Sequence, residues 1–239
     1  MRDVIEVIRK QPTYIQSLNT YLDKYFNNTL FVADSIYNSN KIEGSSLSLG
    51  QTLEVLNTQS SDTVEEKEVI GLNKAMKYLS RYCACKPEIS DLLILHELLM
   101  EDVRPEIAGK YRTKDAYTFT KLPDTTIRRH YYMDANSITS ETEKLFDGEV
   151  RTLEDVILFK LKFSAIHPFA DGNGRVSRLM LNWMLIQIGY PPVTIKGGNH
   201  SRDLYINAMS SYSSYRDVSK LTELLEEELV SLMKIFVLA

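Results

Sequence analysis

The sequence predicts an all-α fold, a single helical domain with one small β-hairpin. Apolar residues recur at three- and four-residue spacings along most of the 239 residues, which is the periodicity of helices that bury one face. Seven prolines and ten glycines interrupt this pattern, and we find neither an internal repeat nor a low-complexity linker. One stretch rich in Thr and Tyr departs from the helical pattern, and we assign the hairpin to it.

The composition is that of an ordinary globular protein, with 44% apolar and 25% charged residues. A formal net charge of −4 argues against binding to nucleic acid, which usually requires a basic face. The N-terminus lacks a signal-peptide apolar region, and no run reaches the roughly 18 apolar residues of a membrane span. Cys83 and Cys85 imply no disulfide framework. We therefore expect a cytoplasmic protein with neither a membrane nor a nucleic-acid partner.

From residue 13 onward, the first third of the chain is predicted to be mostly helical. The segment 13–26 places four apolar residues on one stripe: Ile15, Leu18, Leu22 and Tyr25. Further helices are predicted over 29–44, from Ser48 onward, and over 62–82.

The middle of the chain combines a helix with the hairpin. Residues 90–100 form the helix, with Ser90 as its N-cap and His96 as a packed structural residue among leucines. The segment 109–133 is rich in Thr and Tyr and is broken at Pro123, which is typical of a hairpin.

The remaining helices surround one glycine-rich stretch. Two precede it, over 134–147 and 153–166, and the second carries apolar residues at helical spacing: Val156, Phe159, Phe163 and Ile166. Because the second helix ends directly before His167, a packed helix positions that side chain. The stretch itself opens a further helix that stops near Gly189, and helices resume over 201–213 and 219–237.

This stretch, HPFADGNGRVSR from His167 to Arg178, carries the chemistry. Residues 172–174 form a short loop in which two glycines let a ligand approach the backbone. A loop of this kind at a helix N-terminus presents free N–H groups that hold an anion. Arg175 and Arg178 share a helix face, and two guanidiniums beside such a loop suit a polyphosphate.

Two other residues of the stretch have expected roles. Asp171 would repel phosphate unless it holds a divalent cation that bridges phosphate oxygens, the usual magnesium arrangement. His167 titrates near neutrality and is the natural general base. The plain alternative is a helix N-terminus with solvated arginines and a capping aspartate.

The stretch resembles the Fic motif, H-P-F-x-D/E-G-N-G-R-x-x-R, at every defined position. Fic proteins mostly transfer AMP from ATP to a hydroxyl side chain of a target protein. The resemblance implies the Fic fold and a protein adenylyltransferase, with ATP as substrate and Mg²⁺ as cofactor. It makes His167 the catalytic base and Asp171 the magnesium ligand. The implied nucleotide contacts are Gly172, Asn173, Gly174, Arg175 and Arg178.

A tyrosine also has an implied contact. Tyr205 lies where related Fic proteins place a tyrosine against adenine, and stacking on a base is chemically sensible. A buried core tyrosine fits the same position.

A second motif lies upstream, from Ser39 through Glu43 to Gly44. It resembles the inhibitory pattern S/T-x-x-x-E-G/N of Fic proteins whose inhibitory helix precedes the core. The resemblance implies that Glu43 pairs with Arg178 and so occupies the group that orients the γ-phosphate. If the helix that ends at Gly44 packs against the helix of the glycine-rich stretch, we expect this pair to be bidentate. The alternative is that Glu43 caps a helix and Ser39 satisfies its own backbone.

The hairpin also matches the family. Gly109, Tyr111 and Arg112 fit the G-x-Y-R-like sequence that introduces the flap of Fic proteins. The flap clamps a target segment by adding a strand to it. We therefore expect a protein substrate along the flap, with the chain itself as one candidate, and we expect that the chain can pair as a homo-oligomer. An exposed structural hairpin is the alternative.

The resemblance divides the chain in two. Residues 1–60 comprise the N-terminal helices, including the inhibitory helix at about 29–44. Residues 61–239 form the Fic catalytic core, with the flap at about 112–133.

Three other functions fit the sequence. The first is removal of AMP from a modified protein, which some inhibited Fic proteins perform with the same glutamate. The second is transfer of phosphate or phosphocholine, although the intact Gly-Asn-Gly loop argues against the phosphorylating relatives. The third is a non-catalytic nucleotide-binding regulatory module, which would require a broken motif.

Overall fold

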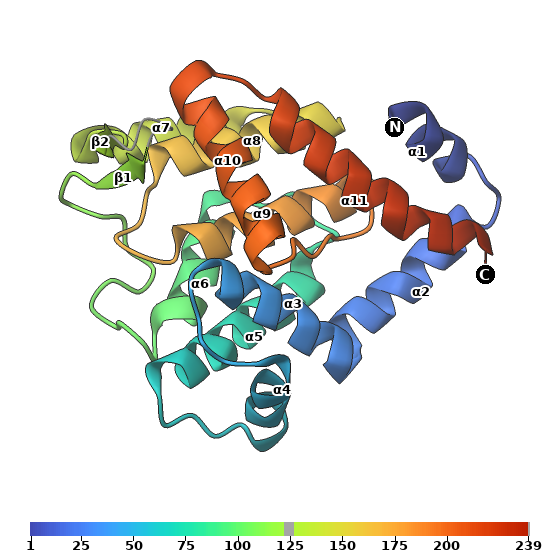
Figure 1. The fold of residues 1–239 in the computed structure, drawn as a ribbon, viewed down its shortest axis with the longest axis horizontal. Helices are drawn as coiled ribbons and strands as arrows, with labels where there is room; N and C mark the ends of the chain where they lie inside the picture. Colours follow the sequence, from blue (N-terminus) through green and yellow to red (C-terminus); the bar gives the residue numbers. More distant parts are fainter. Residues whose placement is uncertain (122–126, 239) are drawn as a thin grey trace.

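Helices make up nearly all of the regular structure in the computed structural model, which describes residues 1–121 and 127–238. This confirms the predicted all-α class, with one antiparallel hairpin in the described part of the chain (Figure 1). The first six helices are α1 (Arg2–Arg9), α2 (Tyr14–Asn27), α3 (Thr29–Ile42), α4 (Leu49–Thr58), α5 (Val64–Tyr82) and α6 (Ile89–Met100). The hairpin strands are β1 (Tyr117–Lys121) and β2 (Ile127–Tyr131). A 3-10 turn, η1 (Ala135–Ser137), leads to α7 (Ile138–Asp147), α8 (Leu153–Ile166), α9 (Asn173–Gln187), α10 (Asn199–Tyr215) and α11 (Ser219–Leu238).

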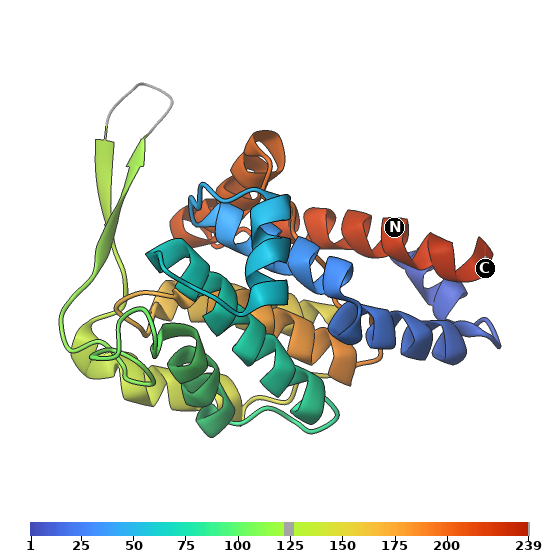
Figure 2. The same cartoon turned by 90° about the horizontal axis from the view of Figure 1, so that it is seen from below.

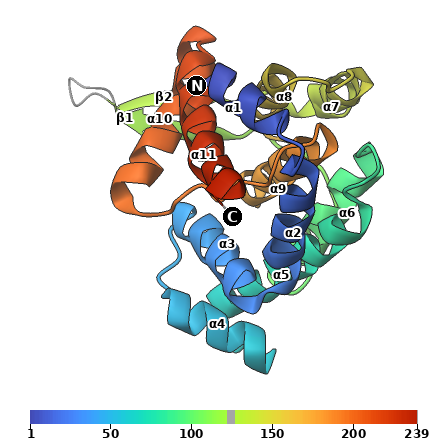
Figure 3. The ribbon, with the colours of Figure 1, turned by 90° about the vertical axis from the view of Figure 1, so that its right-hand side faces the viewer.

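Helix α9, which begins inside the glycine-rich stretch, is enclosed by other helices. It packs against α3, α5, α6 and α8, and lies near the middle of the molecule in Figure 3. A helix that is apolar on all sides is stable only when it is buried on all sides. The apolar residues of α9 are indeed buried around its whole circumference: Val176, Met180, Leu181, Trp183 and Leu185. The stretch that carries the chemistry is therefore anchored in the core.

The start of the chain differs from the sequence expectation in two ways. No helix was predicted from the sequence over residues 2–9, where the structure has α1. This helix packs against α11, and its Ile5 and Ile8 are buried. The stripe predicted for α2 is wrong at Ile15, whose side chain is 63% exposed. Tyr14 is buried instead, and its hydroxyl donates to the Gly189 carbonyl at 2.8 Å. The other predicted positions Leu18 and Tyr25 are buried, so the buried face of α2 is shifted only at its first turn.

The predicted N-cap of α6 is also wrong. Ser90 lies within the first turn, and the N-cap is Glu88, two residues earlier. The reason is local: the Asp91 carboxylate accepts the backbone N–H of Glu88 at 2.7 Å. This satisfies one of the free donors at a helix N-terminus from within the helix itself.

The hairpin lies within the predicted range of about 112–133. Its register pairs Tyr117 with Tyr131 and Phe119 with Arg129. Figure 2 shows the two strands projecting from one end of the helical body. The break predicted at Pro123 lies outside the described residues.

One hydrophobic core joins the N-terminal helices to the rest of the chain. It extends from Ile5 in α1 through Ile36 in α3 to Phe236 in α11. The division at residue 60 stays a prediction. Within residues 1–121 and 127–238, no helix is both long and apolar enough to span a membrane.

Candidate active site

His167 follows the last turn of α8 directly, as the sequence predicted. Its N–H donates to the Phe163 carbonyl at 2.9 Å, and its backbone is left-handed, with φ of +52°. Its imidazole stacks on the Tyr132 ring, with centroids 3.8 Å apart. Burial, followed by the nearby Arg112 charge, lowers the pKa of His167 to about 4. The imidazole is therefore neutral at pH 7, as a general base must be.

The loop after His167 needs its first glycine for both space and geometry. Gly172 has φ of +76°, and a Cβ on it would lie 3.1 Å from Leu99 and 3.3 Å from Met100. Asn173 folds the loop back: its amide accepts from the Phe169 N–H at 2.9 Å and donates to the Phe169 carbonyl at 2.7 Å. The Asn173 side chain thus stabilises the loop, and the contact of Asn173 with a nucleotide stays a prediction.

His96 on α6 supports the same loop from behind. It is fully buried, and its ring stacks on Phe169 with centroids 3.8 Å apart. Its Nδ1 accepts the Gly109 N–H at 3.1 Å, so Nε2 carries the proton and donates to the Asp171 carbonyl at 3.1 Å. The sequence identified His96 as structural but not as a partner of the glycine-rich loop. The signal was a lone imidazole on an apolar helix face, which requires hydrogen-bond partners once buried.

Asp171 presents a carboxylate at the mouth of the site. Its Oδ1 accepts the Gly172 N–H at 2.6 Å, and its side chain is 44% exposed. Arg104 and Arg175 lie 3.6 and 3.5 Å from its oxygens. Among the described residues, no group of three or more Asp, Glu, His or Cys side chains could hold a metal. Asp171 therefore fits Mg²⁺ only if phosphate and water oxygens complete the coordination, which is common for this ion.

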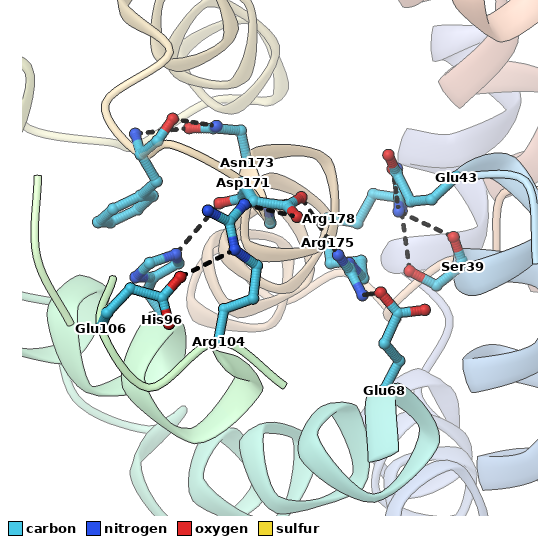
Figure 4. Close-up of polar contacts among 12 residues, drawn as sticks. Ser39, Glu43, Glu68, His96, Arg104, Glu106, Asp171, Asn173, Arg175 and Arg178 are labelled. Atoms are coloured by element: carbon cyan, nitrogen blue, oxygen red, sulfur yellow. Dashed lines mark hydrogen bonds and ion pairs between the residues drawn. The ribbon is translucent and has the colours of Figure 1, made fainter. Parts of the chain in front are cut away.

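Arg175 points towards α5 rather than into solvent. Its Nη1 lies 2.6 Å from Oε1 of Glu68, and its side chain is nearly fully buried (Figure 4). The two atoms are close but out of line for a hydrogen bond, so the contact is an ion pair. Glu68 was not predicted from the sequence, because nothing in its local pattern distinguishes it from a solvated helix residue.

Arg178 is held by the upstream motif. Its Nη2 donates to Oε1 of Glu43 at 2.7 Å and to the Ser39 carbonyl at 2.9 Å, while its Nε donates to the Ser39 hydroxyl at 3.0 Å (Figure 4). The expected bidentate pair with Glu43 is therefore wrong in detail. Ser39 takes the second position of the guanidinium, because it lies one turn before Glu43 on the same face of α3.

The Glu43 carboxylate also lies over the loop. A Cβ placed on Gly174 would overlap its Oε1, so Glu43 occupies the space directly above this glycine. Burial works against the charged carboxylate, but Arg178 outweighs it and lowers the pKa of Glu43 below its usual value. Glu43 is ionised at neutral pH. Gly44, with φ of +102°, turns the chain away immediately afterwards.

Tyr205 lies behind Arg178, in the core, with 4% of its surface exposed. The Lys160 ammonium lies 5.3 Å from its ring centroid and donates to the Ser177 hydroxyl at 2.9 Å. Burial disfavours the phenolate, yet Lys160 and Arg178 together lower the pKa of Tyr205 below its ordinary value. This position agrees with the buried-tyrosine alternative, and the adenine contact stays a prediction.

Residues 86–185, which include the hairpin and the glycine-rich stretch, match the Fic/DOC family. Protein adenylyltransferase Fic of Nematostella vectensis is 32% identical over 171 residues, which are 67% of this chain and 39% of that protein. The protein of the same name from Drosophila erecta is 34% identical over 177 residues, covering 70% of this chain and 34% of that protein. The chain thus spans less than two fifths of the length of these relatives.

Solved structures share the fold. Fic-1 from C. elegans (residues 134–508) superposes with a TM-score of 0.74 at 23% identity, covering 97% of this chain and 72% of that one. A Fic domain containing signaling protein from Bacteroides thetaiotaomicron has a TM-score of 0.75 at 20% identity, covering 99% and 93% of the two chains. The likeness extends through the N-terminal helices as well as the matched region.

Proposed function

Because residues 86–185 of the chain form a Fic domain, we propose that the protein is an adenylyltransferase that moves AMP from ATP to a Ser, Thr or Tyr hydroxyl of a protein target. The observation that carries this proposal is the joint placement of one neutral base and one exposed carboxylate on the loop that opens α9. His167 and Asp171 are these two groups, and Arg175 and Arg178 follow on the helix.

The chemistry follows from these residues. His167 takes the proton of the target hydroxyl as the hydroxyl oxygen attacks the α-phosphorus of ATP. The new bond joins this oxygen to the α-phosphorus, and the bond from the α-phosphorus to the bridging oxygen of the β-phosphate breaks. Pyrophosphate leaves with the electron pair. The catalysis is therefore mainly positioning and charge stabilisation.

The leaving pyrophosphate requires positive charge. The N–H groups at the start of α9 supply partial charge, and the guanidiniums of Arg175 and Arg178 supply whole charges. Asp171 would hold Mg²⁺ jointly with the phosphates, and the ion would neutralise charge on the leaving group. Both arginines must exchange their present partners, Glu68 and Glu43, for phosphate oxygens.

The target segment would bind along the hairpin. The strands β1 and β2 project beside the site, and a segment that pairs with one of them gains main-chain hydrogen bonds whatever its sequence. Tyr132, which follows β2, stacks on the imidazole of His167. A target held on the hairpin is thereby brought near the base.

We further propose that Glu43 inhibits the transfer. It occupies Arg178 and the space above Gly174, which are the two features that a γ-phosphate would need. An ionised carboxylate there repels phosphate. A displacement of about 1 Å from in-line geometry can cost on the order of 100-fold in rate, so inhibition needs no large movement.

Parallel incubations with α-labelled and γ-labelled ATP test both proposals. We expect the wild type to transfer little label from either form of ATP. The Glu43→Gly variant should transfer the α-label, but not the γ-label, to protein acceptors, among which is the variant itself. Adding Arg178→Ala to Glu43→Gly should remove the transfer. Glu54→Gln, which alters an exposed glutamate of α4, is the control and should resemble the wild type.

Other results would contradict these proposals. Transfer of γ-label would indicate a phosphotransferase, and ATP binding without transfer from any variant would indicate a regulatory module. The inhibitory role of Glu43 is wrong if the wild type transfers AMP and a folded Glu43→Gly variant transfers AMP no faster.

One alternative is supported by the same carboxylate. Glu43 is ionised and lies within the site, where it could orient a water molecule for removal of AMP from a modified protein. The test uses Glu43→Gly that has labelled itself with AMP, mixed with unlabelled wild type. Release of labelled AMP after addition of the wild type, but not after addition of more Glu43→Gly, would favour removal of AMP as the reaction of the wild-type protein.

A further inference from the structure

We propose that Arg112 is a positioning residue of the transfer reaction, which ties the base of the hairpin to the backbone of His167. This inference rests on the proposed adenylyl transfer and assigns a residue that neither binds nucleotide nor reacts. Arg112 lies in the segment between α6 and β1, and only 6% of its surface is exposed. Its guanidinium is directed at the protein interior.

The first set of contacts is with the end of α8. The Arg112 Nε donates to the His167 carbonyl at 2.8 Å, and its Nη2 donates to the Ile166 carbonyl at 3.3 Å. The backbone N–H of Arg112 also donates to the Pro168 carbonyl at 2.9 Å. The last carbonyls of a helix have no partner within it, and a cation there is favoured by the helix dipole. Arg112 thus fixes three consecutive carbonyls around the base.

The second set of contacts is with the hairpin. Nη1 donates to the Lys114 carbonyl at 2.7 Å, just before β1, and Nη2 donates to the Met133 carbonyl at 2.5 Å, just after β2. One guanidinium therefore holds both ends of the hairpin and the end of α8. Tyr132, between β2 and Met133, stacks on the His167 ring. A movement of the segments that flank β1 and β2 would consequently also move the groups that surround His167.

This arrangement requires arginine in particular. Four carbonyls from both ends of the hairpin and the end of α8 surround its planar fork, and an ammonium on a lysine stem could not reach them together. Burial disfavours the charge and lowers the pKa of Arg112, with Asp115 and Asp134 opposing the effect from a distance.

The feature that the Arg112 contacts stabilise is the backbone conformation of His167. Its left-handed backbone, with φ of +52°, is unfavourable for a residue with a side chain, so its surroundings must hold it there. The charged groups that act on its ring are Arg112, Glu43 and Asp171, and Tyr132 covers one face. Loss of the Arg112 contacts would leave the His167 side chain in place chemically, but its imidazole ring would no longer be held in one orientation.

The test uses Arg112→Lys and Arg112→Met in the Glu43→Gly background, with Arg151→Met as the control on an exposed arginine before α8. We expect kcat for AMP transfer to fall by roughly 100-fold in both Arg112 variants, with the Kd for ATP nearly unchanged, because a misplaced base affects the chemical step. Amide hydrogen exchange without ATP should rise together at His167 and Met133. Arg151→Met should alter none of these.

Arg112→Lys is the decisive variant, because it keeps the charge and loses the fork. If Arg112→Met does not fold, as shown by its thermal melt, Arg112→Lys carries the test alone. Unchanged kcat in a folded Arg112→Lys, or loss of ATP binding in parallel with kcat, overturns the proposal. If Glu43→Gly itself transfers no AMP, the proposed function fails, and the exchange measurement decides separately whether Arg112 couples the hairpin to His167.

Discussion

At the scale of single residues, the site depends on groups held in unfavourable states. His167 is a neutral, half-buried imidazole in a left-handed conformation, and Glu43 is an ionised carboxylate that lies directly above Gly174 with 38% of its side chain exposed. Each is maintained by a specific cation, Arg112 for His167 and Arg178 for Glu43. Perturbed groups of this kind gather at functional sites more often than elsewhere.

The first prediction concerns the base. His167→Asn in the Glu43→Gly background should retain its fold and lose AMP transfer by about 10²–10⁴-fold, the usual effect of removing a general base. Asparagine is chosen because it tolerates φ above zero better than alanine does. Initial rates with α-labelled ATP and thermal melts measure the two effects. A rate near that of the parent would remove His167 from the role of base.

The second prediction concerns the carboxylate. Asp171→Asn should weaken ATP binding in the presence of Mg²⁺ and have little effect in its absence, since it replaces a charged oxygen ligand by a neutral one. Calorimetric titrations with and without Mg²⁺ provide the comparison, and Asp147→Asn is the control on an exposed aspartate of α7. Equal losses under both conditions would show that Asp171 does not bind the ion.

At the scale of elements, the inhibitory contact joins two helix ends. The last turn of α3 carries Ser39, and Glu43 is the cap that follows, so both face the first two turns of α9, where Gly174 and Arg178 lie. Asn28 fixes the other end of α3, because its side chain accepts from the N–H groups of Leu30 and Phe31. The helix is thereby a defined arm that presents one carboxylate to one arginine.

The third prediction follows from this arrangement. Ser39→Ala should raise AMP transfer above that of the wild type but below that of Glu43→Gly, because it removes one of the three hydrogen bonds that hold Arg178. The lost bond is worth about 1 kcal/mol, so the thermal melt should fall slightly. Ser35→Ala, one turn earlier and bonded to Tyr25, is the matched control. Equal rates for the two variants would show that Ser39 does not hold Arg178 for inhibition.

At the scale of the whole molecule, the glycine-rich loop is the meeting point of distant parts of the chain. His96 attaches it to α6, Arg112 attaches it to the hairpin, and the buried apolar residues of α9 attach it to the core. One hydrophobic core continues from α1 to α11, so the inhibitory arm and the site belong to one packed body. Global stability and the geometry of the site are therefore linked.

The fourth prediction tests that link through pH. Burial lowers the pKa of His96 to about 4 from its usual 6.5, so between these values the unfolded chain binds the proton and the folded chain does not. The contribution is complete above pH 6.5 and is lost as the pH falls towards 4. The free energy of unfolding lost in this way, once the pH is below 4, is at most about 3 kcal/mol.

Urea unfolding at pH 7.5 and 4.5 measures this effect. The wild type should lose more stability on acidification than His96→Gln does, since glutamine does not titrate. His200→Gln, an exposed histidine at the start of α10, is the control and should follow the wild type. The same acid loss in His96→Gln and the wild type would contradict the prediction.

Local patterns in the sequence establish the helical class, the place of the hairpin and the two motifs. Each of these is expressed in residues that are near one another along the chain, as helical spacing or as a loop that begins a helix. The motif residues His167, Asp171, Arg175 and Arg178 are therefore identifiable from the sequence alone. The pairing of Glu43 with Arg178 could be expected from resemblance, although the two are 135 residues apart.

Packing between distant elements establishes which groups those residues meet. Glu68, His96 and the bonds of Arg112 reach the site from helices and loops distant in sequence, and no local pattern shows which groups these residues contact. The same holds for Ile15, which is exposed while its neighbour Tyr14 is buried and donates its hydroxyl to the Gly189 carbonyl in the segment after α9. Local periodicity fixes where a helix forms, but tertiary contacts fix how it is rotated and which buried polar groups find partners.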